Sequence, residues 1–119
     1  AGLKWIEPGR CAIIPGLSIT EPHHDVMRGE ETQILGGVEA GLLPADALVC
    51  HPGTHNKWIE LEAGCVTRFR TVMTGELFRL LEDHSILSDM MRGDAAPGPA
   101  FDDGVEHGLA HDDLPSALF

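Results

Sequence analysis

The stretch VMRGEETQILGG, residues 26–37, decides how the centre of the chain folds. It places a cation, a glycine and two adjacent carboxylates directly before an apolar run. Carboxylates in the first turn of a helix are stabilised by the helix macrodipole and by the free N–H groups there. We therefore predict a helix from Gly29 to about Ala40, stopped by Gly41 and Pro44, with an ionised carboxylate at the edge of a cleft.

The two carboxylates at this helix start are not equivalent. The predicted apolar stripe consists of Ile34, Leu35, Val38 and Leu42. Projecting the helix puts Glu31 near the middle of that stripe and Glu30 at its edge. Adjacent helical residues point about 100° apart, so the pair cannot act as two facing carboxylates. The local pattern alone favours two solvated carboxylates, and Arg28 could pair with either or bind an anionic substrate through its planar fork.

Strand periodicity follows the helix. A short strand from Ala47 leads into a polar turn over 51–56 and a strand over 57–62, in which Lys57, Ile59 and Leu61 share one face. Ala63-Gly64 is a tight turn, and 65–73 is the returning strand. These segments predict a β-meander.

The flanking segments carry weaker signals. Residues 11–14 are predicted as a buried strand without a sequence-adjacent partner, and 17–25 as a loop. Thr74 is predicted to N-cap a helix that ends near His84. A short helical piece over 86–91 and a linker over 93–99 follow. A last helix is predicted from the recurrence of Phe101, Val105 and Leu109, with Gly104 and Gly108 allowing close packing.

Composition narrows the class of protein. A length of 119 residues with 43% hydrophobic residues fits one ordinary domain or a piece of a larger one. Eight basic and nineteen acidic residues give a net charge of −11. That charge argues against partners such as nucleic acid or an anionic membrane. A small anionic substrate remains possible, because backbone N–H groups and Mg²⁺ offset charge locally.

Cysteine usage points to a reducing compartment. The three cysteines, Cys11, Cys50 and Cys65, form no CxxC pair, so neither a disulfide framework nor a structural zinc site is predicted. No apolar run reaches the roughly 20 residues of a membrane span, and the first residues lack the apolar region of a signal peptide. We expect a cytoplasmic protein. A homo-oligomer is left open.

Two further groups of residues have chemical potential. A strand that leads into Gly53-Thr54 can present successive N–H groups and a hydroxyl to a phosphate, although such turns are also common without any function. Seven histidines raise the possibility of a metal site, with His23, His24 and Asp25 joined by Glu30. No HExxH pattern or cysteine set supports zinc, so solvated histidines are the simpler interpretation.

Three ordered blocks make the chain recognisable. VMRGEETQ (26–33), PGTHNKW (52–58) and FRTVMTGEL (69–77) resemble the 2-dehydro-3-deoxygalactonokinase family. The resemblance runs from Ile14 through Phe101. Because members of that family are more than twice this length, the chain resembles the middle of such an enzyme.

The resemblance implies a fold class and an activity. It implies an α/β fold with a mixed sheet, part of a two-lobed, actin-like sugar kinase with ribonuclease-H-like lobes. Residues 1–45 would end the first lobe and 46–119 would begin the second. ATP and Mg²⁺ would lie between the lobes, with the γ-phosphoryl group passing to the C6 hydroxyl of 2-dehydro-3-deoxy-D-galactonate.

The resemblance also assigns roles to residues. Gly29-Glu30 falls where related kinases place a Gly-Asp pair, which makes Glu30 the general base and Glu31 the second choice. Arg28 and Asp25 are the substrate-binding candidates. The predicted contacts to ATP phosphates come from Gly53, Thr54, His55, Asn56 and Lys57. The acidic residue often found before such a turn is replaced by His51-Pro52, so no protein ligand to magnesium is assigned.

Two expected elements are absent from the sequence. It contains no upstream Asp-x-Gly-Ser/Thr phosphate turn and no downstream glycine-rich adenine-binding segment. We therefore expect the chain alone to be inactive as a kinase. Two alternatives remain at this stage: a small metal-binding hydrolase that uses His23, His24, Asp25 and Glu30, and a non-catalytic interaction domain.

Overall fold

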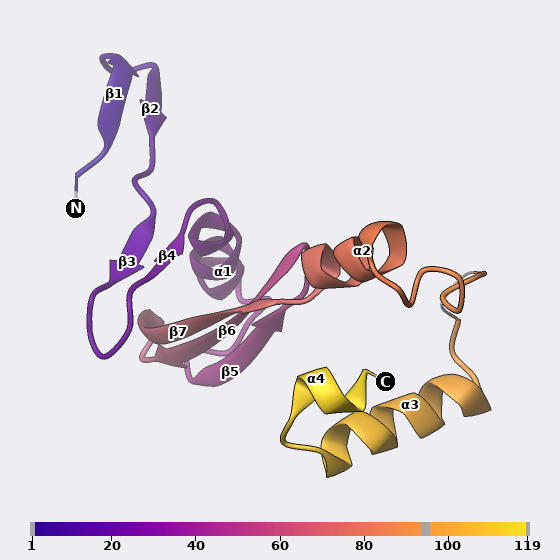
Figure 1. The fold of residues 1–119 in the computed structure, drawn as a ribbon. Helices are drawn as coiled ribbons and strands as arrows, with labels where there is room; N and C mark the ends of the chain where they lie inside the picture. The colour runs from indigo at the N-terminus through magenta and orange to yellow at the C-terminus, as the bar shows by residue number, and fades with distance from the viewer. Residues whose placement is uncertain (1, 94–95, 119) are drawn as a thin grey trace.

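A computed structural model describes residues 2–93 and 96–118 (Figure 1). Four short strands come first: β1 (Lys4–Glu7), β2 (Cys11–Ile13), β3 (Leu17–Ile19) and β4 (Asp25–Met27). The central elements are α1 (Glu30–Glu39), β5 (Ala47–His51), β6 (His55–Glu62) and β7 (Cys65–Met73). The last elements are α2 (Gly75–His84), α3 (Pro99–Ala110) and α4 (Leu114–Ala117).

The centre of the molecule is a three-stranded antiparallel sheet in the order β5-β6-β7. Along β6, Lys57, Ile59 and Leu61 are buried while the residues between them are exposed, which confirms the predicted alternation. The β6–β7 turn consists of Ala63 and Gly64, which both have positive φ. Two positive φ values match a two-residue hairpin turn to the twist of its strands. The predicted meander is therefore confirmed.

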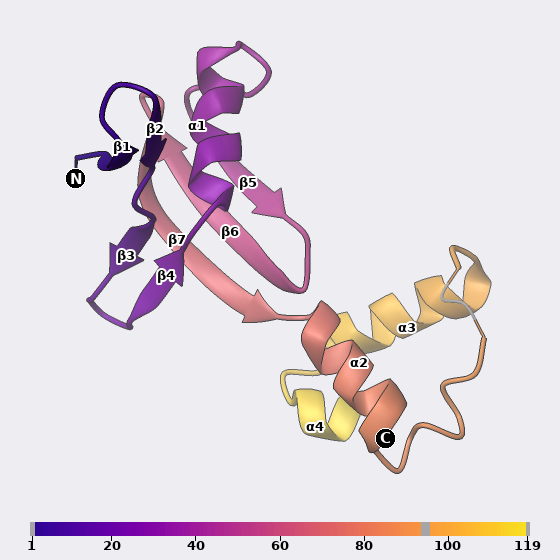
Figure 2. The same cartoon turned by 90° about the horizontal axis from the view of Figure 1, so that it is seen from above.

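Helix α1 covers the inner face of this sheet (Figure 2). The core cluster of buried residues contains Met27, Ile34, Ile59, Leu61 and Phe69. The predicted stripe of α1 is correct at Ile34, whereas Leu42 is 80% exposed because the helix has ended before it. The core joins residues on both sides of position 45, so the two predicted lobe segments share one core in this structure. The assignment of 1–45 and 46–119 to two lobes stays a prediction.

The N-terminal region differs from the sequence-based prediction. Strand β2 has a sequence-adjacent partner, β1, and the predicted loop at 17–25 instead contains β3, which pairs with β4. Strands of three or four residues are too short to show a period, and this is why the pattern missed β1, β3 and β4. The strand predicted at 11–14 is present as β2, but its predicted burial is wrong, because β2 is largely exposed.

Every strand pairing among the described residues is antiparallel. The predicted mixed sheet is therefore wrong. The predicted combination of helices and strands is confirmed.

The C-terminal helices match the predicted pattern only in part. Helix α2 begins after Thr74, but the Thr74 hydroxyl does not cap it and instead bonds the Gly53 carbonyl at 3.4 Å. The segment 86–91 forms turns instead of a helix. Helix α3 forms as predicted, yet its apolar residues are exposed and nothing lies within 4 Å of a Cβ at Gly104 or Gly108. Of the predicted linker, residues 94 and 95 lie outside the described residues.

The chain is elongated. Its radius of gyration is 18.3 Å and its extents are 53 × 30 × 30 Å, whereas a compact domain of this length has a radius of about 13.5 Å. The β1–β2 hairpin projects from one end of the sheet and α2 leads away from the other (Figure 1). None of the helices in the described part of the chain is long and apolar enough to cross a membrane.

Two glycines provide a test of this packing. A Cβ at Gly16 would lie 2.2 Å from the Met27 carbonyl oxygen, whereas a Cβ at Gly36 would meet nothing within 4 Å. We expect Gly16→Ala to lower the free energy of unfolding by about 1–3 kcal/mol through overpacking. Gly36→Ala should raise it by about 0.5–1 kcal/mol, because alanine favours the interior of a helix. Urea denaturation of both variants measures these changes, and equal effects would contradict the close approach of Gly16 to β4.

Candidate active site

The segment between β4 and α1 is a turn braced by its own carboxylates. Gly29 precedes the helix with φ of 125°, a conformation that glycine adopts readily. The Arg28 N–H donates to Glu30 Oε2 at 3.1 Å, and the Gly29 N–H donates to Glu31 Oε2 at 2.6 Å. Both carboxylates therefore fold back onto the backbone that precedes them, and this fixes the shape of the turn.

The two carboxylates differ in access to solvent. Glu31 is only 3% exposed, as the helix projection predicts, while Glu30 is half-buried. Each carboxylate has one oxygen committed to a backbone N–H, and among the described residues Glu30 Oε1 has no hydrogen-bond donor. Glu30 thus keeps an accessible oxygen on a fixed side chain.

A cavity of about 520 Å³ lies beside this turn. Its lining residues are Ala12, Ile13, Ile14, Pro15, Gly16, Arg28, Gly29, Glu31 and Thr32. Arg28 is exposed, and its guanidinium forms no ion pair or hydrogen bond within residues 2–93 and 96–118. An unpaired guanidinium beside a cavity can bind a carboxylate in the two-pronged geometry that arginine favours.

Strand β4, which leads into the turn, is tied to β7 by side chains. Asp25 accepts two hydrogen bonds from Thr71, one from its N–H and one from its hydroxyl, both at 2.6 Å. Lys57 is 6% exposed, and its Nζ donates to Thr71 Oγ1 at 2.6 Å and to the Val26 carbonyl at 2.8 Å. Asp25 was predicted to contact the substrate and Lys57 to contact a phosphate. Both side chains instead form hydrogen bonds to other residues of the chain.

These contacts also decide the ionisation of Asp25. Burial raises the pKa of its carboxyl. The hydrogen bonds from Thr71 and Val26 and the positive charge of Lys57 act in the opposite direction and leave the pKa below its ordinary value of 3.8. Asp25 is consequently ionised at neutral pH.

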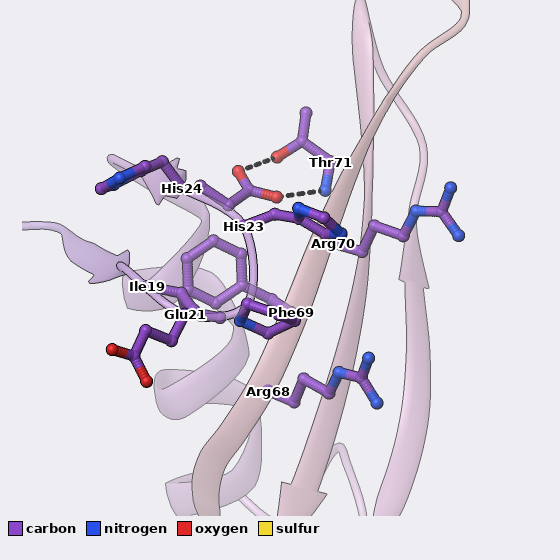
Figure 3. Close-up of a pocket in the computed structure, with 10 residues that line it drawn as sticks. Ile19, Glu21, His23, His24, Arg68, Phe69, Arg70 and Thr71 are labelled. Carbon is purple, nitrogen blue, oxygen red and sulfur yellow. Dashed lines mark hydrogen bonds between the residues drawn. The ribbon is translucent and has the colours of Figure 1, made fainter.

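A second cavity, of about 420 Å³, is lined in part by Asp25 (Figure 3). The ring of Phe69 points into it, while the side chains of Arg68 and Arg70 extend to the opposite face of β7. His23 and His24 line it with Asp25, but no group of three or more His, Cys, Asp or Glu side chains converges anywhere in the described ranges. The metal-binding alternative is therefore not favoured.

Of the predicted phosphate residues, Gly53 and Thr54 lie in the turn between β5 and β6, whereas His55 and Asn56 are the first residues of β6. The turn packs against the start of α2. Asn56 Oδ1 accepts the Gly53 N–H at 2.9 Å, and the Thr54 carbonyl accepts the Glu76 N–H at 3.0 Å. His55 pairs with Glu76. Thr54 is exposed, and its hydroxyl has no hydrogen-bond partner among the described residues. Thr54 is thus the free polar side chain of a turn that its neighbours hold in place.

One hydrogen bond connects the first turn of α1 with the end of β5, the strand that leads into the phosphate turn. His51 Nε2 at the end of β5 lies 2.6 Å from Gln33 Oε1 in the first turn of α1. The acidic start of α1 and the Gly53-Thr54 turn therefore lie at the same end of the sheet. No contact of Gln33 was predicted from the sequence.

The contacts of Thr71 were also not predicted from the sequence. It lies directly opposite Lys57, because a bulge shifts the β6–β7 register between Glu60 and Leu61. One signal was available: Val66 and Phe69, which both face the core, are three residues apart and so break the period of two.

Two known proteins with sequences similar to this chain are kinases. The chain is 44% identical over 98 residues to 2-dehydro-3-deoxygalactonokinase of Escherichia coli (strain K12), matching 82% of this chain and 32% of that protein. It is 50% identical over 97 residues to the probable 2-dehydro-3-deoxygalactonokinase DgoK1 of Rhizobium meliloti (strain 1021), matching 78% of this chain and 31% of that protein. Both relatives are named as carbohydrate kinases.

A solved structure gives the same result. The crystal structure of a protein provisionally assigned as 2-dehydro-3-deoxygalactonokinase, from Sinorhizobium meliloti, superposes with a TM-score of 0.74 at 44% identity. The match covers 88% of this chain and 35% of that one. The model of the 2-keto-3-deoxy-galactonokinase family matches residues 1–119, so the chain belongs to this family. The resemblance predicted from the sequence is confirmed, and the chain spans about a third of the length of these relatives.

The lowered pKa of Asp25 makes a prediction about acid stability. The folded protein holds the Asp25 carboxyl ionised to lower pH than the unfolded chain does, so its contribution to stability is present above the ordinary pKa of 3.8 and is lost as the pH falls through the lowered value. The difference in free energy of unfolding between the protein and its Asp25→Asn variant should therefore shrink below about pH 4. Urea denaturation across this range measures it, and a difference independent of pH would contradict the assignment.

Proposed function

We propose that this chain is part of a kinase that transfers the γ-phosphoryl group of ATP to the C6 hydroxyl of 2-dehydro-3-deoxy-D-galactonate. The observation that carries the proposal is the braced Arg28–Glu31 turn, in which Arg28 lines a cavity and its guanidinium has no partner among the described residues. Glu30 does not line this cavity, but it keeps one accessible carboxylate oxygen in the same turn. The names of the relatives support the substrate and the reaction class. As part of this proposal, the whole protein has two actin-like lobes, and the chain alone, at a third of that length, is inactive.

Glu30 is the proposed general base. Phosphoryl transfer depends mainly on positioning and charge stabilisation, and a base that accepts the hydroxyl proton contributes about 10²–10⁴ in rate. Glu30 has a half-buried carboxylate with one oxygen held by the Arg28 N–H and the other available for a proton. Glu31 is almost completely buried and braces Gly29, which suits a structural part in the same turn.

The segment Gly53–Asn56, which consists of the turn after β5 and the start of β6, is the proposed phosphate site. Thr54 offers an exposed hydroxyl, and the Gly53 N–H can turn to a phosphate if Asn56 releases it. Glu76 is the carboxylate paired with His55 beside this turn. Mg²⁺ in kinases neutralises charge on the phosphates and is held largely by their oxygens. The residues of this turn are therefore compatible with Mg²⁺–ATP, although they supply no dedicated ligand set within the described ranges.

The two glutamates can be distinguished by matched substitutions in the full-length kinase. Glu30→Gln removes the proton acceptor, so kcat should fall by about 100-fold or more with little change in the KM for ATP. In Glu31→Gln the side-chain carbonyl can still accept the Gly29 N–H, so kcat should fall by about fivefold at most. Steady-state kinetics with ATP and the sugar acid measure both effects.

The isolated 119-residue chain serves as the negative control for this assay. The reverse order of effects would make Glu31 the base, and unchanged turnover in both variants would remove the acidic turn from the proposed catalytic centre.

Arg28 is the proposed ligand of the substrate carboxylate. Removing its charge-assisted hydrogen bonds in Arg28→Ala should raise the KM for the sugar acid by about 10- to 100-fold while the KM for ATP stays near its original value. Arg28→Lys keeps the charge but loses the planar fork, so it should restore only part of the affinity. Arg10→Ala, an exposed arginine paired with Glu7 in the β1–β2 hairpin, is the matched control. Equal KM values for Arg28→Ala and the control would refute the assignment.

A further inference from the structure

We propose that Thr71 and Lys57 are positioning residues that hold β4, and with it the acidic Arg28–Glu31 turn, in register against β7. Asp25 is the acceptor at the end of this chain of contacts and does not itself bind substrate. The catalytic consequence rests on the proposed function, whereas the positioning itself does not.

The hydroxyl of Thr71 connects the other two side chains. It accepts a hydrogen bond from Lys57 Nζ at 2.6 Å and donates one to Asp25 Oδ1 at 2.6 Å. A hydroxyl that accepts from an ammonium must turn its single proton elsewhere, here toward the carboxylate. The three groups therefore fix one another's orientation, with the cation and the anion on opposite sides of one oxygen.

The Asp25 carboxylate also completes the edge of the central sheet. Strand β7 is an edge strand in the order β5-β6-β7, and β4 belongs to a separate two-stranded sheet. The Thr71 N–H on this edge donates to Asp25 Oδ2 at 2.6 Å, so a side-chain oxygen takes the place of a neighbouring strand's carbonyl. Because β3 and β4 have only three residues each, their own pairing gives β4 little rigidity.

Lys57 attaches the same strand at a second point. Its Nζ donates to the carbonyl of Val26, the residue after Asp25 and two before Arg28. At 6% exposure Lys57 could reach a nucleotide only by giving up both of its hydrogen bonds. A buried ammonium without partners is costly, so the side chain is held where it is. The two attachments fix the backbone immediately before the catalytic turn.

The proposal is tested with three variants of the full-length kinase. Thr71→Val removes the hydroxyl and Thr71→Ser keeps it. Thr67→Val removes a hydroxyl from the same strand, which among the described residues bonds only the Glu60 carbonyl, at 3.3 Å. Two measurements are made on each: amide hydrogen exchange in peptides covering 26–31 and 75–84, and steady-state kinetics.

Thr71→Val should speed exchange over 26–31 but not over 75–84. It should also lower kcat by about 100-fold, as expected for a displaced catalytic group, with the KM for ATP changed less than about twofold. Thr71→Ser should restore both the exchange rates and kcat, and Thr67→Val should change neither.

Two results would overturn the proposed positioning, and a third would overturn its catalytic consequence. Unchanged exchange over 26–31 in Thr71→Val would show that the hydroxyl does not hold the turn. Equally faster exchange over 75–84 would show a general loss of stability instead of local positioning. An unchanged kcat despite faster exchange over 26–31 would remove the catalytic consequence. A wild-type protein without activity on the sugar acid would refute the proposed function, while the exchange data would still decide the positioning.

Discussion

The packing of α1 against the inner face of β6 is the contact on which the rest of the structure depends. Ile34 from the helix and Met27 from the strand before it are buried together with Ile59. Gly29 turns the chain between Met27 and the helix. Burial of Met27 and Ile34 against the same sheet therefore fixes where this turn lies. The acidic residues are therefore placed by apolar packing on either side of them, and their own charge only adjusts the local shape.

A polar set of contacts extends this core along the same face. Lys57 follows the alternation of Ile59 and Leu61 and so points inward, where a cation is stable only with partners. Thr71 and the Val26 carbonyl supply them. Such a fully bonded network specifies geometry more sharply than apolar packing, because each hydrogen bond depends on direction as well as distance. That property suits the backbone leading into a proposed catalytic turn.

Several elements could not have been placed from the sequence, for definite physical reasons. The β1–β2 and β3–β4 hairpins are too short to show a period, and their strands form because each has an antiparallel partner. The apolar residues of α3 predict its helix but not the exposure of Phe101 and Leu109. Periodicity records which residues share a face, and it carries no information about what lies opposite that face.

The sequence by itself determined the start of α1, the β5–β7 meander and the Ala63-Gly64 turn. Each of these follows from local backbone preferences or from the period of one element. Only the tertiary structure decided the roles of Asp25, Lys57 and Thr71. The register set by the two-residue turn at Ala63-Gly64 would place Arg70 opposite Lys57 if β6 and β7 paired without a bulge. The bulge shifts this register by one residue and places Thr71 there. A shift of one residue exchanges the faces of a strand, and it depends on packing that no local pattern contains.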